Sequence, residues 1–233
     1  MRTTMRFLVA LTAFALVACD SGAAQIAPSD SGDAGTASVV PIAQRFITTA
    51  DAPGTKPDPV EKRESTEDFD EFIAYLGSHL FVDLDREEAT RVFRDAGFTW
   101  AALDVRYFGA THKRGAPHLF GSVVEVGSEG GAKSVLDLIE ADSMKPCPMS
   151  CAVQVSSFDV EGIPDGRGVR RLATAERIAA AGTDDQHPFD SYWVGFTQGA
   201  IVYAVNLQGL PGSVSEEQAQ EIARAYYDRL TSI

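Results

Sequence analysis

Two cysteines and a methionine near the middle of the chain are the residues best suited to chemistry. Cys147, Met149 and Cys151 lie in the segment PCPMSC, and sulfur atoms are the soft donors that Cu(I) prefers. The two cysteines can also form a disulfide, because a tight turn brings their Cα atoms within reach and Pro148 favours a turn. Paired cysteines of exported proteins are usually oxidised. We predict a disulfide, with metal binding and free thiols as the alternatives.

The Cys-Pro-x-x-Cys spacing of residues 147–151 resembles the metal-binding motif of the Sco copper chaperones. That family places the motif after a strand of a thioredoxin-like fold and adds a remote histidine ligand. In this sequence the motif follows a predicted helix and precedes a predicted strand, so the surroundings differ from those of the family. The resemblance implies an envelope copper chaperone as an alternative function, and the different surroundings favour the disulfide.

A cationic cluster lies in the segment THKRGAPHLFG of an otherwise acidic domain. Its members, His112, Lys113, Arg114 and His118, could contact an anionic ligand or a carboxylate of a partner. A hydrated hairpin loop is the favoured reading, because most surface charge clusters have no ligand. The sequence has no Gly-x-Ser-x-Gly elbow, no His-Glu-x-x-His, no phosphate-binding glycine loop and no EF-hand loop. We therefore predict no catalytic residue and no cofactor.

The chain as a whole is acidic. Its 233 residues include 33 Asp and Glu against 20 Lys and Arg, which gives a net charge of −13. Such a surface repels phosphate backbones, so nucleic acid is not an expected partner. It also gives no reason to bind anionic lipid directly, so any membrane contact is expected to come from an anchor.

The amino terminus has the pattern of an export signal. Arg2 and Arg6 precede the apolar residues 7–18. This run is too short for the roughly 20 residues that a membrane-spanning helix requires. A charged start, a short apolar run and a small residue at its end are typical of a signal peptide.

The end of this signal, Leu16-Val17-Ala18-Cys19, resembles the lipobox of bacterial lipoproteins. The resemblance implies cleavage before Cys19, attachment of diacylglycerol to its thiol and further acylation by a fatty acid such as palmitate. Two or more acyl chains anchor a protein stably. Asp20 resembles the signal that retains lipoproteins on the inner membrane of Gram-negative cells. We therefore expect a cell-envelope lipoprotein on the extracytoplasmic face of the membrane.

Residues 19–64 are predicted to be the lipidated cysteine and a flexible linker. They are rich in Ser, Gly, Ala, Asp, Pro and Thr and contain too few apolar residues to form a core. Residues 39–47 are a mildly apolar interruption that could either dock on the domain or stay unstructured. Pro41 argues against a central strand there.

Residues 65–233 are predicted to form one α+β domain. Apolar residues recur at helical spacing in 69–80, 85–96, 132–139 and 215–230, and β-rich runs occupy 98–108, 119–126, 152–160, 169–173, 191–198 and 201–207. The order α-α-β-β-α-β-(β)-β-β-α favours a mostly antiparallel sheet with helices packed on one face. Asp85 and Ser215 are predicted to begin helices, and Gly97 to follow the end of one. Trp193 points opposite to Tyr192, so the second face of its strand is not fully polar.

These features favour a non-enzymatic, lipid-anchored domain that binds an envelope protein or a small ligand. The anchor, the linker and the missing catalytic motifs support this hypothesis. The layout is similar to that of many small bacterial lipoproteins with an exported α+β domain. The alternatives are the metal chaperone based on residues 147–151 and a hydrolase whose site is assembled from scattered residues. A cleft that holds a histidine and an aspartate within hydrogen-bond reach would favour the hydrolase.

Overall fold

The computed structural model describes residues 40–58, 64–73, 85–109, 116–146, 153–174, 176 and 189–233. Several sequence predictions lie outside these ranges, among them the signal peptide, the lipid attachment at Cys19, the loop residues 112–114 and the cysteine segment 147–151. The described residues belong to one compact unit.

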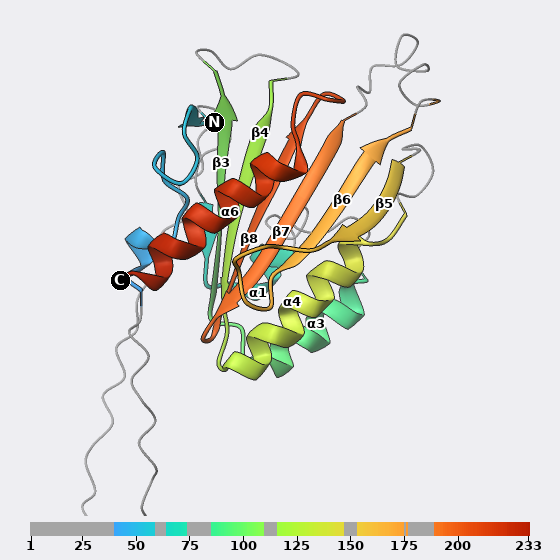
Figure 1. Cartoon of the computed structure of the whole chain (residues 1–233). Coiled ribbons are helices and arrows are strands. Elements are labelled where there is room, and N and C mark those ends of the chain that lie inside the picture. The colour runs from blue at the N-terminus through green and yellow to red at the C-terminus, as the bar shows by residue number, and fades with distance from the viewer. Residues whose placement is uncertain are drawn as a thin grey trace, which may run out of the picture. The chain divides into compact units, whose positions relative to one another are not determined.

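The centre of the fold is an eight-stranded sheet, which is antiparallel as expected (Figure 1). Its order is β1-β3-β4-β8-β7-β6-β5, and β2 pairs with β3 as well. The strands are β1 (Thr55–Pro57), β2 (Glu64–Thr66), β3 (Trp100–Phe108), β4 (His118–Glu125), β5 (Val153–Phe158), β6 (Arg167–Ala173), β7 (Asp190–Gln198) and β8 (Ile201–Gly209). β3 to β8 match the predicted strands to within about two residues, because alternating apolar residues mark a strand locally.

The described helices are η1 (Ile42–Gln44, a 3-10 helix), α1 (Phe69–Glu71), α3 (Arg86–Asp95), α4 (Glu129–Ser143) and α6 (Glu216–Thr231). Together with the sheet they confirm the α+β class. Asp85 accepts hydrogen bonds from the N–H groups of Glu87 and Glu88, and Ser215 accepts one from Gln218. Both predicted helix starts are therefore confirmed. Among the described residues, no helix is both long and apolar enough to cross a membrane.

Helices cover both faces of the sheet, which corrects the expectation that they share one face (Figure 1). Tyr203 and Val205 of β8 belong to the core cluster beneath α6. Val202 and Ala204 belong to the cluster beneath α3 and α4, and Trp193 of β7 lies there too. The reason is that successive residues of a strand point to opposite faces, and both sets are apolar in these strands. Each face therefore needs its own cover.

Residues 40–58, which we name the amino-terminal strap, belong to the folded unit rather than to the predicted linker. Val40, Phe46, Ile47 and Ala52 are buried in the same cluster as α6. The strap ends in β1, whose three residues include Lys56 and Pro57 and gave no strand signal in the sequence. The folded unit thus begins at least 25 residues earlier than the predicted boundary at residue 65, and the strap covers the part of the sheet that α6 leaves open.

Arginine side chains from distant parts of the chain hold the strap in place. Arg229 of α6 pairs with Asp51 at 2.8 Å and donates to the carbonyl oxygens of Gln44 and Phe46. Arg45 is itself buried in the strap and pairs with Glu125 of β4 at 2.7 Å. Charge-assisted hydrogen bonds of this kind are stronger than neutral ones, so they fix a segment with few apolar residues.

Candidate functional site

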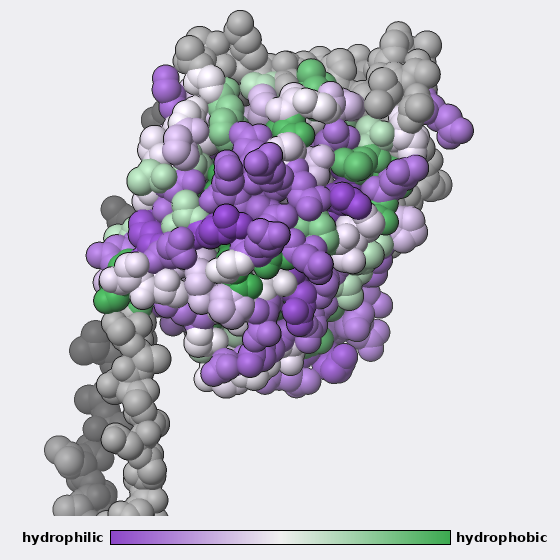
Figure 2. All heavy atoms as spheres, in the orientation of Figure 1, coloured by the Kyte–Doolittle hydropathy of each residue, from purple (hydrophilic) through white to green (hydrophobic). Residues whose placement is uncertain are grey.

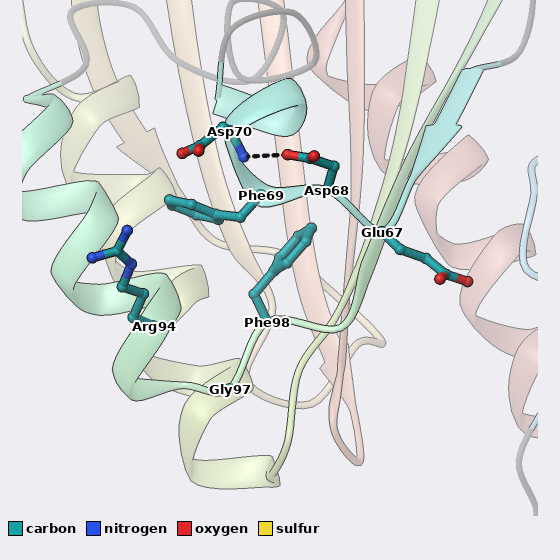
Figure 3. Close-up of a pocket in the computed structure, with 7 residues that line it drawn as sticks. All are labelled: Glu67, Asp68, Phe69, Asp70, Arg94, Gly97 and Phe98. Carbon is teal, nitrogen blue, oxygen red and sulfur yellow. Dashed lines mark hydrogen bonds between the residues drawn. The ribbon is translucent and has the colours of Figure 1, made fainter. Parts of the chain in front are cut away.

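The face that carries α6 is covered mainly by hydrophilic side chains, with hydrophobic residues in scattered patches (Figure 2). It shows no broad apolar area of the kind that marks a flat protein interface. The candidate site is instead a pocket of about 470 Å³ beside α1 and the end of α3, which we name the aromatic pocket (Figure 3). It is lined by Glu67, Asp68, Phe69, Asp70, Arg94, Gly97 and Phe98.

The way α3 ends determines where one wall of the pocket lies. Gly97 has a φ of +72°, a conformation that favours glycine, and its N–H donates to the carbonyl oxygen of Arg94 at 3.0 Å. The N–H of Phe98 donates to the carbonyl oxygen of Phe93 at 3.0 Å. These two bonds form a Schellman motif, which confirms the predicted role of Gly97. The motif turns the chain so that the Phe98 ring packs back on α3.

The opposite wall is the start of α1. The Asp68 carboxylate accepts hydrogen bonds from the N–H groups of Asp70 at 2.9 Å and Glu71 at 3.0 Å. This cap orients Phe69, whose ring centroid lies 5.6 Å from that of Phe98 at an interplanar angle of 69°. The two rings come from separate segments and both line the pocket (Figure 3).

Two fully buried rings pack behind the phenylalanines that line the pocket. Phe72 and Phe93 have no exposed surface. Phe72 stacks on Phe98 with centroids 5.1 Å apart and meets Phe93 edge-on at the same distance. Phe69 and Phe98 are half-buried, so part of each ring faces the pocket. The floor is thus a rigid aromatic surface rather than a set of mobile side chains.

The rim carries three carboxylates and one guanidinium. Glu67, Asp68, Asp70 and Arg94 are all exposed. The guanidinium carbon of Arg94 lies 6.0 Å from the centroid of the Phe69 ring, which is within cation–π range. The rim therefore has an excess of negative charge above an aromatic floor, and such a surface attracts cations.

Two other pockets are also lined by three carboxylates and one cation each, and in both the cation forms an ion pair. A groove of about 260 Å³ between α3 and α4 is lined in part by Asp142 and Lys145, whose charged atoms lie 3.1 Å apart. A pocket of about 390 Å³ beside β5 and β6 contains Arg167, which pairs with Glu140 at 3.1 Å and with Asp137 outside the pocket at 3.7 Å. The aromatic pocket differs from both in its pair of half-buried phenylalanine rings, Phe69 and Phe98.

Of the predicted anion-contact residues, the structure describes His118. Its Nε2 atom lies 3.8 Å from Oδ2 of Asp58, an aspartate whose side chain is almost fully buried. This is an ion-pair distance, longer than the 2.6–3.2 Å of a direct hydrogen bond. The two residues line none of the three pockets described above.

The described residues contain no group of three or more His, Cys, Asp or Glu side chains that could hold a metal ion. The cysteine segment 147–151 lies outside those residues. Its disulfide and its copper alternative both stay predictions.

Sequence reasoning missed the aromatic pocket because its walls meet only in the folded protein. Phe69 lies on the apolar face of the predicted helix 69–80, and Phe98 begins the predicted strand 98–108. The one available signal was the pairing of Gly97 with Phe98, since an apolar residue after a helix-ending glycine often packs back on that helix.

Comparisons with known proteins find only distant structural likeness. No protein-family model matches the chain, and no curated protein matches it. Among solved structures, the extracellular domain of PknH from Mycobacterium tuberculosis is similar with a TM-score of 0.46 and 14% sequence identity. That match covers 77% of this chain and 86% of the other.

Proposed function

We propose that this protein is a lipid-anchored domain on the extracytoplasmic face of a cell membrane, where it binds a partner through the aromatic pocket. The lipobox-like residues 16–19 support the anchor. The chain's net charge of −13 gives it no affinity of its own for anionic lipid, so the anchor would supply the membrane contact.

The aromatic pocket is the observation that carries the binding role. Its floor offers apolar ring surface and its rim offers charged groups, which is the combination found in recognition sites. Its lining contains no serine, threonine, cysteine, histidine, lysine or tyrosine, so it lacks the usual nucleophile with an adjacent base. Asp68, one of its carboxylates, already caps α1. Binding therefore accounts for the pocket better than catalysis does.

Replacing Cys19 with alanine is expected to move the protein from the membrane fraction to the soluble extracytoplasmic fraction. The reason is that the thiol of Cys19 is the only proposed attachment point for lipid. Fractionation followed by intact-mass measurement checks this result, and the double variant Cys147→Ala/Cys151→Ala is the matched control that should stay in the membrane. If the Cys19→Ala protein stays there as well, the anchor is not at Cys19.

Replacing Phe98 with aspartate is expected to abolish capture of the partner when the anchored protein is cross-linked in its native envelope and purified. The substitution removes the Phe98 ring from the pocket floor and puts a charged carboxylate in its place, which disfavours contact with an apolar part of the partner. Phe189→Asp is the matched control, because Phe189 is an exposed phenylalanine outside the pocket. The measurement is the amount of the same captured protein in the Phe98→Asp and Phe189→Asp samples. Equal amounts in both samples would show that the pocket is not the binding site.

A further inference from the structure

The chemistry of the aromatic pocket identifies the kind of partner it takes, provided that the pocket is the binding site proposed above. We infer that it binds an arginine side chain presented by a segment of a partner protein. Three observations lead to this inference: the charge of the rim, the way Arg94 already lies on the floor, and the shape of the ring surface.

The rim favours a positively charged occupant. Three of its four charged groups are carboxylates, from Glu67, Asp68 and Asp70. Arg94 is the one cation of the lining, and its guanidinium already lies against the Phe69 ring. A cation entering beside Phe98 meets negative charge and a ring face together, and both attract it.

Arg94 demonstrates how a guanidinium fits this surface. Its guanidinium carbon lies 6.0 Å from the Phe69 centroid. The same contact recurs elsewhere in the fold, where Arg45 lies 5.7 Å from the Trp100 ring and Arg229 lies 5.3 Å from the Tyr226 ring. Phe98 is the second half-buried ring of the pocket and offers the same type of surface to a guanidinium from outside.

Arginine suits the site better than lysine does. A guanidinium is planar and weakly hydrated, so it stacks on a ring while its N–H groups donate to carboxylates at the ring's edge. Phe98 and the exposed residues Glu67, Asp68 and Asp70 line the same pocket, so a ring face and carboxylates are both present there. An ammonium is compact and strongly hydrated, so it would lose more hydration free energy than a guanidinium on entering the pocket.

The test uses a short peptide with two arginines separated by glycine, titrated against the full-length mature protein with Cys19 replaced by alanine. Peptides with lysine or glutamate at the same positions, and free arginine amide, are the comparison probes. We expect the arginine peptide to bind most tightly and to shift the backbone amide signals of Gly97 and Phe98 in NMR spectra. Binding should weaken as salt is raised, since exposed charges contribute.

Pocket variants should change this affinity selectively. Phe98→Leu and the double variant Glu67→Gln/Asp70→Asn are each expected to weaken binding of the arginine peptide about threefold to tenfold, in line with the strength of exposed cation–π contacts. The matched controls are Phe189→Leu and Glu129→Gln, which change the same residue types outside the pocket and should leave the affinity unchanged.

Each other outcome overturns a defined part of the argument. Tighter binding of the glutamate peptide, lost on Arg94→Gln, would show that the pocket takes an anion; the inference fails while the proposed binding role stands. Binding of lysine and arginine peptides with equal affinity would remove the guanidinium specificity. If free arginine amide binds as tightly as the peptide, the occupant is a small molecule rather than a protein segment. If no probe binds and Phe98→Asp also leaves partner capture intact, the inference and the proposed function both fail.

Discussion

Replacing Arg106 with methionine is expected to lower the free energy of unfolding by about 3–5 kcal/mol, the cost of breaking a buried ion pair from one side. Arg106 lies in β3 and is 4% exposed. Its Nη1 atom is 3.6 Å from Oδ2 of the equally buried Asp104. It also donates to the hydroxyl oxygens of Thr55 and Thr49, each at 2.9 Å. Methionine fills similar space, so the loss comes from the charge and the hydrogen bonds.

Arg91→Met is the matched control for this variant. Arg91 pairs with Asp95 on the exposed surface of α3 at 3.9 Å, and such pairs contribute about 0.5 kcal/mol or less. The double variant Asp104→Leu/Arg106→Met should recover much of the loss, because the buried carboxylate goes with its partner. Urea unfolding of the three proteins measures these values. Equal stability of the Arg106→Met and Arg91→Met proteins would show that Arg106 does not hold the strap.

The second large effect concerns Tyr203 and Tyr226, whose rings meet edge-to-face and which should respond oppositely to loss of the hydroxyl. Tyr226 of α6 donates its hydroxyl hydrogen to the carbonyl oxygen of Arg45 in the strap. Tyr226→Phe leaves that buried oxygen without this donor, at an expected cost of about 1–3 kcal/mol. The hydroxyl of Tyr203 is buried without a hydrogen-bond partner in the described structure. Tyr203→Phe removes an unsatisfied group and should raise stability by about 1 kcal/mol.

The same two hydroxyls make the protein sensitive to alkali. Burial raises the pKa of Tyr203 to about 12 and the pKa of Tyr226 well above its usual value of 10. Between pH 10 and pH 12 the unfolded chain loses these protons while the folded protein keeps them. The contribution of these hydroxyls to the free energy of unfolding is therefore fully present below pH 10. As the pH rises above 10, the free energy of unfolding falls by about 1.4 kcal/mol per pH unit for each tyrosine.

Unfolding midpoints measured from pH 8 to pH 11 test this expectation. The Tyr203→Phe protein should lose stability less steeply above pH 10 than the wild type. A parallel decline in both proteins would mean that the Tyr203 hydroxyl ionises in the folded state as easily as in water.

Local patterns predicted the strands and the helix ends because their causes lie within a few residues. Asp85, Gly97 and Ser215 act on the backbone next to them, and the alternation of Tyr192 and Val194 marks a strand directly. The covering of both faces is indicated in part, since Trp193 points away from Tyr192. The sequence does not identify the helix that covers Trp193, because that helix comes from a distant part of the chain.

The strap and the aromatic pocket depend on contacts that no local pattern carries. The strap is polar enough to resemble a linker, and what holds it are arginines far along the sequence, above all Arg229, 178 residues after Asp51. The pocket needs Phe69 and Phe98 to meet across two segments. In both cases the sequence shows the side chains but not their partners. For residues 40–58, composition alone favours a flexible linker, whereas in the structure these residues pack on the sheet.

The strap would have a mechanical consequence if the protein is anchored at Cys19 as proposed. A pull on the anchor would reach the strap and then Arg229, through its bonds to Gln44, Phe46 and Asp51. From α6 the load would spread to β7 and β8, which α6 contacts directly. The last helix would thus hold the described segment that lies nearest to the anchor in the sequence.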